Sequence, residues 1–151
     1  MWEPGMTKPD MELGTNWDDD VVMEDKIYMR NWKNSFVFGP KESKWELDHV
    51  LNSRRWVGAC VVDNVLYYFD VNRNQLRAYD PKHRRWTVVN GLEKLLLKTT
   101  GSCWSKTVRY GGKMVLFFYK LRSMGIWCAE IALETRQGGE ISGKRFQGAV
   151  V

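Results

Sequence analysis

A ten-residue phrase occurs twice in this chain, and the repetition constrains the fold more than any other feature. FVFGPKESKW (residues 36–45) and RAYDPKHRRW (residues 77–86) share an aromatic residue, a Pro-Lys pair, a basic residue and a final Trp at matching positions. The final tryptophans are Trp45 and Trp86, and upstream Tyr28 matches Tyr67 at nearly the same separation. A period of about 40 residues that carries strand-like runs is typical of a β-propeller or a similar array.

Turn residues divide each repeat into short strands. VVDNVLYYFD consists of two β-rich runs separated by Asp63-Asn64, a pair suited to the positive φ of a tight hairpin. VRYGGKMVLFF repeats this arrangement with Gly111-Gly112 at the start of a third, looser copy. IWCAEIALE, which contains Trp127, then matches the strand that begins at Leu76. Each unit is therefore predicted to form four antiparallel strands, while GLEKLLLK (residues 91–98) is predicted to be a short helical or irregular loop.

These repeats predict the organisation of the whole chain. The fold class is all-β, a partial propeller of about three four-stranded antiparallel blades. The opening WEPG resembles the WELD that begins at Trp45, so the chain is expected to start on the last strand of an earlier copy. The expected segments are a blade tail with an irregular lead-in (1–20), a first blade (21–48), a second blade (55–90), an inter-blade loop (91–106), a third blade (107–145) and a C-terminal tail (146–151).

Composition excludes several classes of protein. The 151 residues are 44% hydrophobic and 27% charged, which are values of a globular domain. Three cysteines without a CxxC pair favour neither a disulfide framework nor a zinc site. The first residues lack the basic start and apolar run of a signal peptide, and no apolar stretch approaches the ~20 residues of a membrane span. A cytoplasmic or nuclear location is expected.

The strand and turn motifs resemble those of a known family. VVDNVLYYFD, LRAYDPKHRRW with the GLE that follows it, YGGKMVLFF and IWCAEIALE are similar to the C-terminal blades of plant F-box/kelch-repeat proteins. The resemblance covers residues 45–144 well and residues 21–45 moderately. It implies a kelch-type propeller that acts as a protein-interaction module.

The same resemblance implies a role in ubiquitin ligases. In that family an N-terminal F-box docks onto a cullin-containing ligase, and the propeller presents the substrate. No segment of this chain resembles an F-box, so binding to the ligase adaptor is not expected. About three blades of a propeller that usually has more would leave sheet faces uncovered. Marginal stability, self-association or dependence on a partner is therefore expected.

The proline phrase itself has three interpretations: a basic docking patch, a nuclear-import signal at KHRR, or a structural turn. Pro81 suits the second position of a type I turn, and the Asp80 carboxylate can accept backbone N–H groups ahead of it. Trp45 and Trp86 would then pack between blades. The structural turn is favoured, on the face opposite the partner-binding loops.

Candidate binding residues lie in the loops between the second and third strands of each unit and between successive units. Basic residues predominate there, which suits an acidic peptide, and one Trp could serve as an anchor. The candidates are Trp32, Lys33, Arg54, Arg55, Arg73 and Arg122. The residues assigned to the structural repeat are Tyr28, Trp45, Tyr67, Trp86, Gly111, Gly112 and Trp127.

Two other functions stay open from the sequence. A basic-rimmed fragment could bind acidic or nucleic-acid ligands without a ligase connection, or the chain could be a truncated product with no independent function. Catalysis is not expected, because GxSxG, HExxH and GxxxxGK[ST] motifs do not occur. No cofactor or metal is expected either, since His49 and His83 are assigned to opposite faces.

Overall fold

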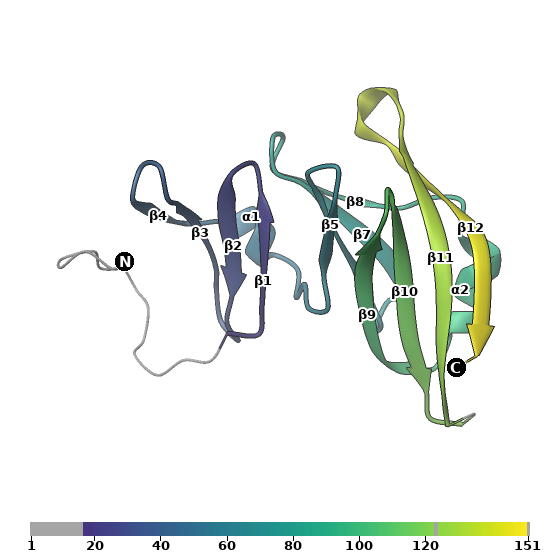
Figure 1. The fold of residues 1–151 in the computed structure, drawn as a ribbon. Coiled ribbons are helices and arrows are strands. Elements are labelled where there is room, and N and C mark those ends of the chain that lie inside the picture. The colour runs from purple at the N-terminus through teal and green to yellow at the C-terminus, as the bar shows by residue number, and fades with distance from the viewer. Residues whose placement is uncertain (1–16, 123, 151) are drawn as a thin grey trace.

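Three antiparallel sheets, each made of four consecutive strands, form the protein (Figure 1). The computed structural model describes residues 17–122 and 124–150. Blade A consists of β1 (Asp19–Met23), β2 (Lys26–Arg30), β3 (Ser35–Gly39) and β4 (Lys44–Leu47). Blade B consists of β5 (Cys60–Val62), β6 (Val65–Asp70), β7 (Gln75–Asp80) and β8 (Arg85–Val88). Blade C consists of β9 (Ser102–Tyr110), β10 (Lys113–Lys120), β11 (Gly125–Thr135) and β12 (Ile141–Val150). The predicted all-β class is confirmed.

Short helices occupy the connections. Helix α1 (His49–Asn52) follows blade A, α2 (Glu93–Thr99) lies between blades B and C, and the 3₁₀ turn η1 (Gln137–Gly139) joins β11 to β12. The connection expected at 91–106 thus contains α2 and the start of β9. The expected tail at 146–151 contains the end of β12, because that strand pairs along the long β11 as far as Trp127↔Val150. No helix in the described ranges is long and apolar enough to cross a membrane.

The first hairpins of blades A and B each turn through two residues with positive φ. Asp63 and Asn64 have φ values of 50° and 59°, and Glu24 and Asp25 have values of 52° and 59°. Two successive residues with positive φ define the type I′ turn, whose twist matches that of the flanking strands. Gly111 also has a positive φ, of 60°. The positive φ expected for Asp63-Asn64 is confirmed.

Strand register shows that blades A and B are copies of one unit. Tyr28 pairs with Val37 in blade A as Tyr67 pairs with Ala78 in blade B. The final tryptophans also correspond, since Trp45 pairs with Phe38 as Trp86 pairs with Tyr79. The two blades therefore share one register, and blade B has one more residue pair between its second and third strands.

Blade C keeps the pattern with a longer second strand, since β10 has eight residues and β6 has six. Its first hairpin aligns Tyr110 with Val62, an offset of 110 − 62 = 48. In the third strand, Trp127 pairs with Phe118 as Gln75 pairs with Asp70, an offset of 127 − 75 = 52. The match of IWCAEIALE to the strand at Leu76 is thus out by two positions, because the longer strand pair of blade C moves the second loop outward.

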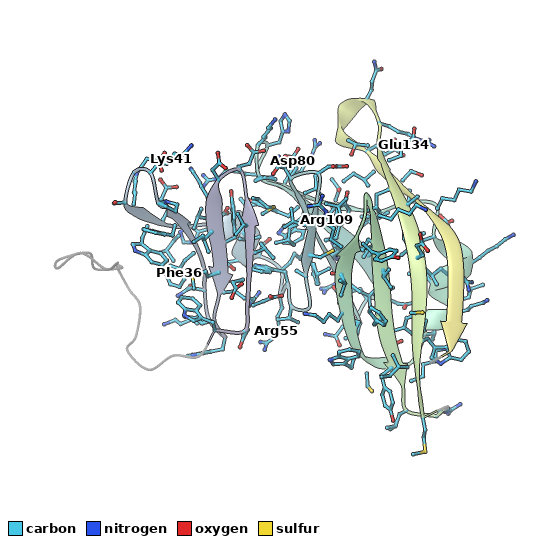
Figure 2. The ribbon with its side chains drawn as sticks, viewed as in Figure 1. Phe36, Lys41, Arg55, Asp80, Arg109 and Glu134 are labelled. Carbon is cyan, nitrogen blue, oxygen red and sulfur yellow. The ribbon has the colours of Figure 1, made fainter. Side chains whose placement is uncertain are left out.

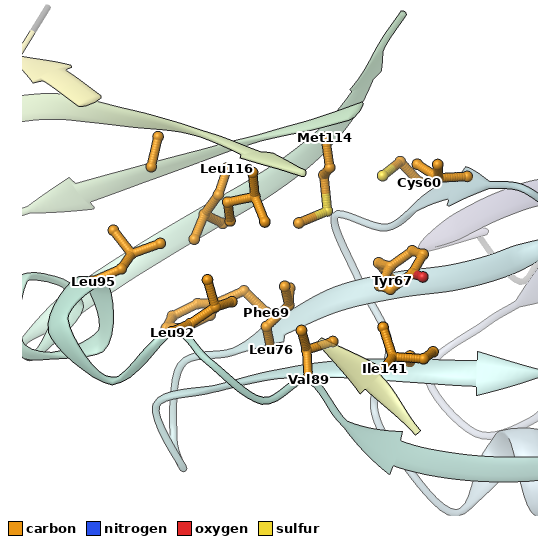
Figure 3. Packing of buried hydrophobic residues seen from close by; sticks show 14 of the residues in the cluster. Cys60, Tyr67, Phe69, Leu76, Val89, Leu92, Leu95, Met114, Leu116 and Ile141 are labelled. Carbon is orange, nitrogen blue, oxygen red and sulfur yellow. The ribbon is translucent and has the colours of Figure 1, made fainter. Parts of the chain in front are cut away.

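Alternation along the strands of blade B places apolar side chains on both of its faces. On one face Leu66, Tyr68 and Tyr79 pack against blade A and helix α1. On the other face Tyr67 and Phe69 join the larger cluster, which blade C completes (Figure 3). The core is thus two layers between three blades, and side chains of this size each stabilise the fold by about 1.5–3 kcal/mol when fully buried.

Tryptophans of the repeat have different neighbours in the three blades. Trp86 has its ring centre 5.4 Å from that of Tyr68 and donates its Nε1–H to the Val50 carbonyl at 2.8 Å. It therefore connects blade B to the helix after blade A. Trp45 packs 4.5 Å from Phe38 within blade A. Trp127 stacks on Phe118 within blade C at 6.3 Å.

Hydrogen bonds also link neighbouring blades at or just before their first strands. The Ala59 N–H donates to Asp19 Oδ2 at 2.9 Å, and the Thr107 N–H donates to the Gly58 carbonyl at 2.8 Å. The Thr107 hydroxyl donates to that same carbonyl at 2.8 Å. Ala59 and Thr107 hold the same repeat position in blades B and C. Each contacts a residue of the previous blade, Asp19 or Gly58, that lies one repeat position earlier. This regular step defines how each blade is placed on the next.

Candidate partner-binding groove

The segment from Ser53 to Gly58, between helix α1 and strand β5, begins the candidate site. Trp56 is fully buried and donates its Nε1–H to Ser35 Oγ at 3.0 Å. The Arg30 guanidinium lies 5.8 Å from the Trp56 ring centre and donates to the Arg54 carbonyl at 3.0 Å. Because Trp56 is anchored inward, its neighbours Arg55 and Val57 are left exposed.

The β6–β7 loop forms the opposite side of the site. Asp70 Oδ1 accepts the backbone N–H groups of Asn72 at 3.1 Å and Arg73 at 3.2 Å, which closes the loop in an Asx turn. Asn74 donates its side-chain amide to the Leu96 carbonyl at 2.8 Å, so helix α2 supports the loop from behind. The loop is therefore held in place before any partner binds.

Between these two segments lies a hollow of about 270 Å³. It is lined by Ser53, Arg54, Arg55, Val57, Tyr68, Phe69, Asp70, Val71, Asn72 and Arg73. A second hollow, of about 280 Å³, shares Val57, Phe69 and Val71 with the first and reaches Trp104 and Lys106 on strand β9. Together they form one groove, called here the arginine groove, with an apolar floor and cationic walls.

The charges in the arginine groove are only partly compensated. Asp70 forms ion pairs with Arg73 at 3.4 Å and with Arg77 at 3.5 Å. Arg54 and Arg55 form no ion pair with any carboxylate of the described residues. Burial, and then the neighbouring Arg55 charge, lower the pKa of the Arg30 guanidinium. An acidic group bound here would meet positive charges that lack a counter-ion among the described residues.

Two aromatic residues of strand β6 beside the groove are uncharged and firmly held. Burial, and then the negative charge of Asp70, raise the pKa of Tyr68 to about 12, so its hydroxyl stays neutral at physiological pH. Tyr68 and Phe69 are both buried residues of β6, and their backbone is fixed by pairing with β7. Their side chains point to opposite faces of blade B, so the apolar side chains that the groove exposes are those of Val57, Val71 and Trp104, beside the guanidinium groups. Such a mixture of aromatic and Arg side chains is typical of protein-interaction surfaces.

Three of the six sequence-predicted binding residues meet in this groove: Arg54, Arg55 and Arg73. Trp32 and Lys33 lie on the β2–β3 loop, which is tied to the segment before the groove because the Asn52 side chain donates to the Lys33 carbonyl at 3.1 Å. Trp32 is 61% exposed. Arg122 is exposed on the β10–β11 loop and lines neither hollow.

Sequence reasoning missed the apolar part of the groove. Val57, Phe69, Val71 and Trp104 come from three separate segments, and only their packing places them side by side. The sequence places Trp104 in a connecting loop, whereas it belongs to β9 and is 47% exposed. The sequence does carry a signal for this longer strand, because the strand-forming residues before Gly111 extend back to Ser102.

The proline phrase lies at the other edge of the molecule. Figure 2 shows Lys41, Asp80 and Glu134 at one edge of the blades and Arg55 at the opposite edge. Asp80 Oδ1 accepts the backbone N–H of Lys82 at 2.9 Å and that of His83 at 3.4 Å, as expected for a structural turn. Within the described ranges, no three His, Cys, Asp or Glu residues are grouped so as to hold a metal ion.

Comparison with known proteins agrees with this architecture. The family model described as FKB95, Kelch-repeats domain, matches residues 1–147. The chain belongs to the kelch-repeat family. The three blades are therefore a partial kelch-type propeller, and the predicted resemblance is confirmed.

Relatives of this kelch-repeat chain include two F-box/kelch-repeat proteins of Arabidopsis thaliana. One is 54% identical over 145 residues, which are 95% of this chain and 38% of the relative. Another is 36% identical over 143 residues, which are 94% of this chain and 37% of the relative. The kelch-repeat chain thus spans about two fifths of the length of these relatives.

Proposed function

We propose that this kelch-repeat chain is a protein-interaction module that binds an acidic, partly aromatic segment of a partner protein in the arginine groove. The observation that carries the proposal is the convergence of Arg54, Arg55 and Arg73 around a hollow that the exposed side chains of Val57 and Val71 also line. Guanidinium groups form bidentate hydrogen bonds with carboxylates, and the apolar floor would bury the non-polar part of the bound segment. An exposed aromatic side chain on the adjacent β2–β3 loop supplies an anchor at the rim.

A binding measurement tests the proposal. The probe is a fluorescent peptide that alternates Glu with Tyr, and the matched control peptide carries Gln in place of Glu. Anisotropy titration is expected to give tighter binding of the Glu peptide. Arg54→Ala and Arg55→Ala are each expected to weaken it about tenfold, the loss typical of a hydrogen bond to a charged group.

Lys82→Ala serves as the control variant, because Lys82 is an exposed residue of the turn that contains Asp80, at the opposite edge. Equal binding of the two peptides, or equal losses in the groove and control variants, would contradict the proposal. Circular dichroism of each variant establishes that the fold is intact.

A second candidate function is binding of single-stranded nucleic acid. Exposed Trp104 near Lys106 offers a stacking surface next to a cation, and the chain carries a net charge of +5. An unstructured oligonucleotide that binds with a steep salt dependence, more tightly than the Glu peptide, would favour this candidate.

The ligase role is a finer proposal, supported by the F-box/kelch names of the relatives. In that role the arginine groove would present a substrate to a ubiquitin ligase. Co-purification with the ligase adaptor tests it. Capture of the adaptor by the 151-residue chain would support a direct receptor role, whereas failure of capture with intact peptide binding would leave only the interaction module.

A further inference from the structure

The far face of blade C, which points away from blade B, is largely apolar and open. Thr107 is buried against blade B, so alternation along β9 directs Val108 to the opposite face, at the end of the row of sheets (Figure 1). Tyr110 lies on that same face. Val108 is 38% exposed and Tyr110 is 67% exposed. Contiguous apolar side chains on a sheet face usually mark a site of association.

This open face repeats the face that blade B buries. Four of its apolar residues hold repeat positions that are buried in the cluster between blades B and C. In β9, Val108 and Tyr110 hold the positions of Cys60 and Val62. In β10, Val115 and Phe117 hold those of Tyr67 and Phe69. The charged residues on this face include Lys106, Lys113 and Glu130, and Glu130 pairs with Lys113 at 3.1 Å. The far face of blade C is therefore built to receive another blade.

Blade A carries the complementary surface at the other end of the row. Ile27 and Phe38 pair across β2 and β3 as Leu66 and Tyr79 pair across β6 and β7. Leu66 and Tyr79 are fully buried in the cluster that joins blades A and B. Val22, opposite Ile27 on the outer face of blade A, is 64% exposed. That outer face thus carries apolar side chains at these docking positions, whereas Phe36 on the same face is buried and packs against Trp17.

Charges across the two faces also match. Within the chain, Asp19 contacts Ala59, and Gly58 contacts Thr107. Gly58 holds in blade B the repeat position of Asp19, and Thr107 holds in blade C that of Ala59. In both contacts the residue of the later blade is therefore one repeat position further along the chain. The same step places Lys106 of blade C beside Asp20 of a following blade A, because Lys106 holds the position of Gly58 and Asp20 holds that of Ala59. Both side chains are exposed and of opposite charge. This pairing favours a second blade A over an unrelated partner.

We propose that two copies of this chain associate head to tail, with the far face of blade C in each copy packed on the outer face of blade A in the other. Two such contacts close a ring of six blades, a number within the usual range of about four to eight for propellers. A head-to-tail contact forms a closed ring when its rotation closes and a filament when it does not. The proposal does not rest on the proposed function, although Lys106 also lines the second hollow of the arginine groove.

The mass of the purified chain in solution tests this proposal. Sedimentation equilibrium at micromolar concentration is expected to give twice the chain mass of 17.7 kDa. A monomer at every concentration would overturn the proposal. A series of growing species would overturn the closed ring, since a dimer with both faces covered has no free surface of this kind.

Variants on the open face test the residues involved. Val108→Asp and Tyr110→Asp are each expected to raise the dissociation constant at least about tenfold, because a charge would be buried in an apolar contact. Leu97→Asp is the matched control, since Leu97 is a 78% exposed apolar residue on α2. Far-UV circular dichroism identifies any variant that fails to fold. Equal effects of Leu97→Asp and Tyr110→Asp on association would overturn the assignment.

A charge swap tests the register independently of apolar packing. Lys106→Glu and Asp20→Lys should each weaken the dimer about tenfold through like-charge contacts, and the double variant should restore it. Both positions are exposed, so neither change is expected to disturb the fold of one chain. A double variant as weak as the single variants would overturn the proposed pairing of the two faces.

Discussion

The Tyr79 hydroxyl donates a 2.7 Å hydrogen bond to Asp48 Oδ2, and both side chains are buried. The other carboxylate oxygen, Oδ1, accepts the Leu51 N–H at 2.9 Å and caps helix α1. One carboxylate therefore fixes the connection after blade A and holds it on the central strand pair of blade B. This contact joins blade A, through the connection that follows it, to blade B.

Removal of the Asp48 carboxylate should destabilise the protein strongly. Asp48→Ala is expected to lower the free energy of unfolding by about 2–4 kcal/mol, because it removes a helix cap and leaves the buried Tyr79 hydroxyl without an acceptor. Tyr79→Phe should cost less, about 1–2 kcal/mol, since the cap is retained. Urea unfolding followed by Trp fluorescence measures both. Equal costs would mean that the cap contributes nothing.

Buried tyrosines should make the fold sensitive to alkali. Burial raises the pKa of Tyr28 to about 12, with a further contribution from Asp48, and burial also raises the pKa of Tyr68 to about 12. The folded state thus keeps protons that the unfolded state, with a Tyr pKa of about 10, releases. Stability from these groups is complete below about pH 10 and is lost as the pH rises toward about 12.

Denaturant titrations between neutral and alkaline pH measure this loss. Tyr68→Phe should reduce the slope of stability against pH above about pH 10, because one of the shifted groups is removed. Tyr110→Phe is the control at protein concentrations where the chain is monomeric, since Tyr110 is exposed in the single chain. An unchanged slope in Tyr68→Phe would contradict the prediction.

Gly91 should tolerate no side chain. Its φ is 85°, and a Cβ atom there would lie 2.7 Å from the Gly143 carbonyl oxygen, beside the hydrogen bond between Asn90 and Gly143. Gly91→Ala is expected to destabilise the protein by about 2–4 kcal/mol, through both backbone strain and the clash with β12. Gly101→Ala isolates the strain, because Gly101 has a φ of 82° and open space around it. Thermal unfolding should show the larger loss for Gly91→Ala, and equal losses would mean that the clash is relieved by movement of β12.

The Trp86 contact should contribute measurably to the joining of blades A and B. Trp86→Phe removes the hydrogen bond to the Val50 carbonyl together with part of the ring that packs on Tyr68, and should cost about 1–3 kcal/mol. Trp104→Phe is the control at a 47% exposed site. Chemical unfolding that shows no difference between the two variants would contradict this role.

Local sequence patterns predict most of the fold. The positive-φ turn at Asp63-Asn64 follows from residue type and spacing alone. The recurrence of the proline phrase predicts the equivalent register of Trp45 and Trp86 opposite Phe38 and Tyr79. Such features depend on neighbours within one blade, so a single sequence can specify them. Blade C is matched less accurately, because its longer strands shift the register after the second loop.

The site is less predictable. Arg54, Arg55 and Arg73 are identified by charge and by their place in the repeat, but their convergence depends on how blade B is rotated relative to the segment before it. Val57 and Trp104 carry no local signal for a shared groove, because they lie far apart in the sequence and meet only across a blade boundary. Arg122, on the corresponding loop of blade C, is also an exposed basic residue between the second and third strands, yet it lies outside the groove.

The sequence by itself determined the repeat, the strands, the turns and the family of this protein, since each follows from patterns within one or two copies of the repeat. Only the tertiary structure decided which side chains share the arginine groove and which sheet faces stay open. Side-chain direction within a strand alternates by residue, but the partner that each face meets depends on the packing of whole blades. That packing joins residues such as Asp48, in the connection after blade A, and Tyr79 of blade B, which share one hydrogen bond.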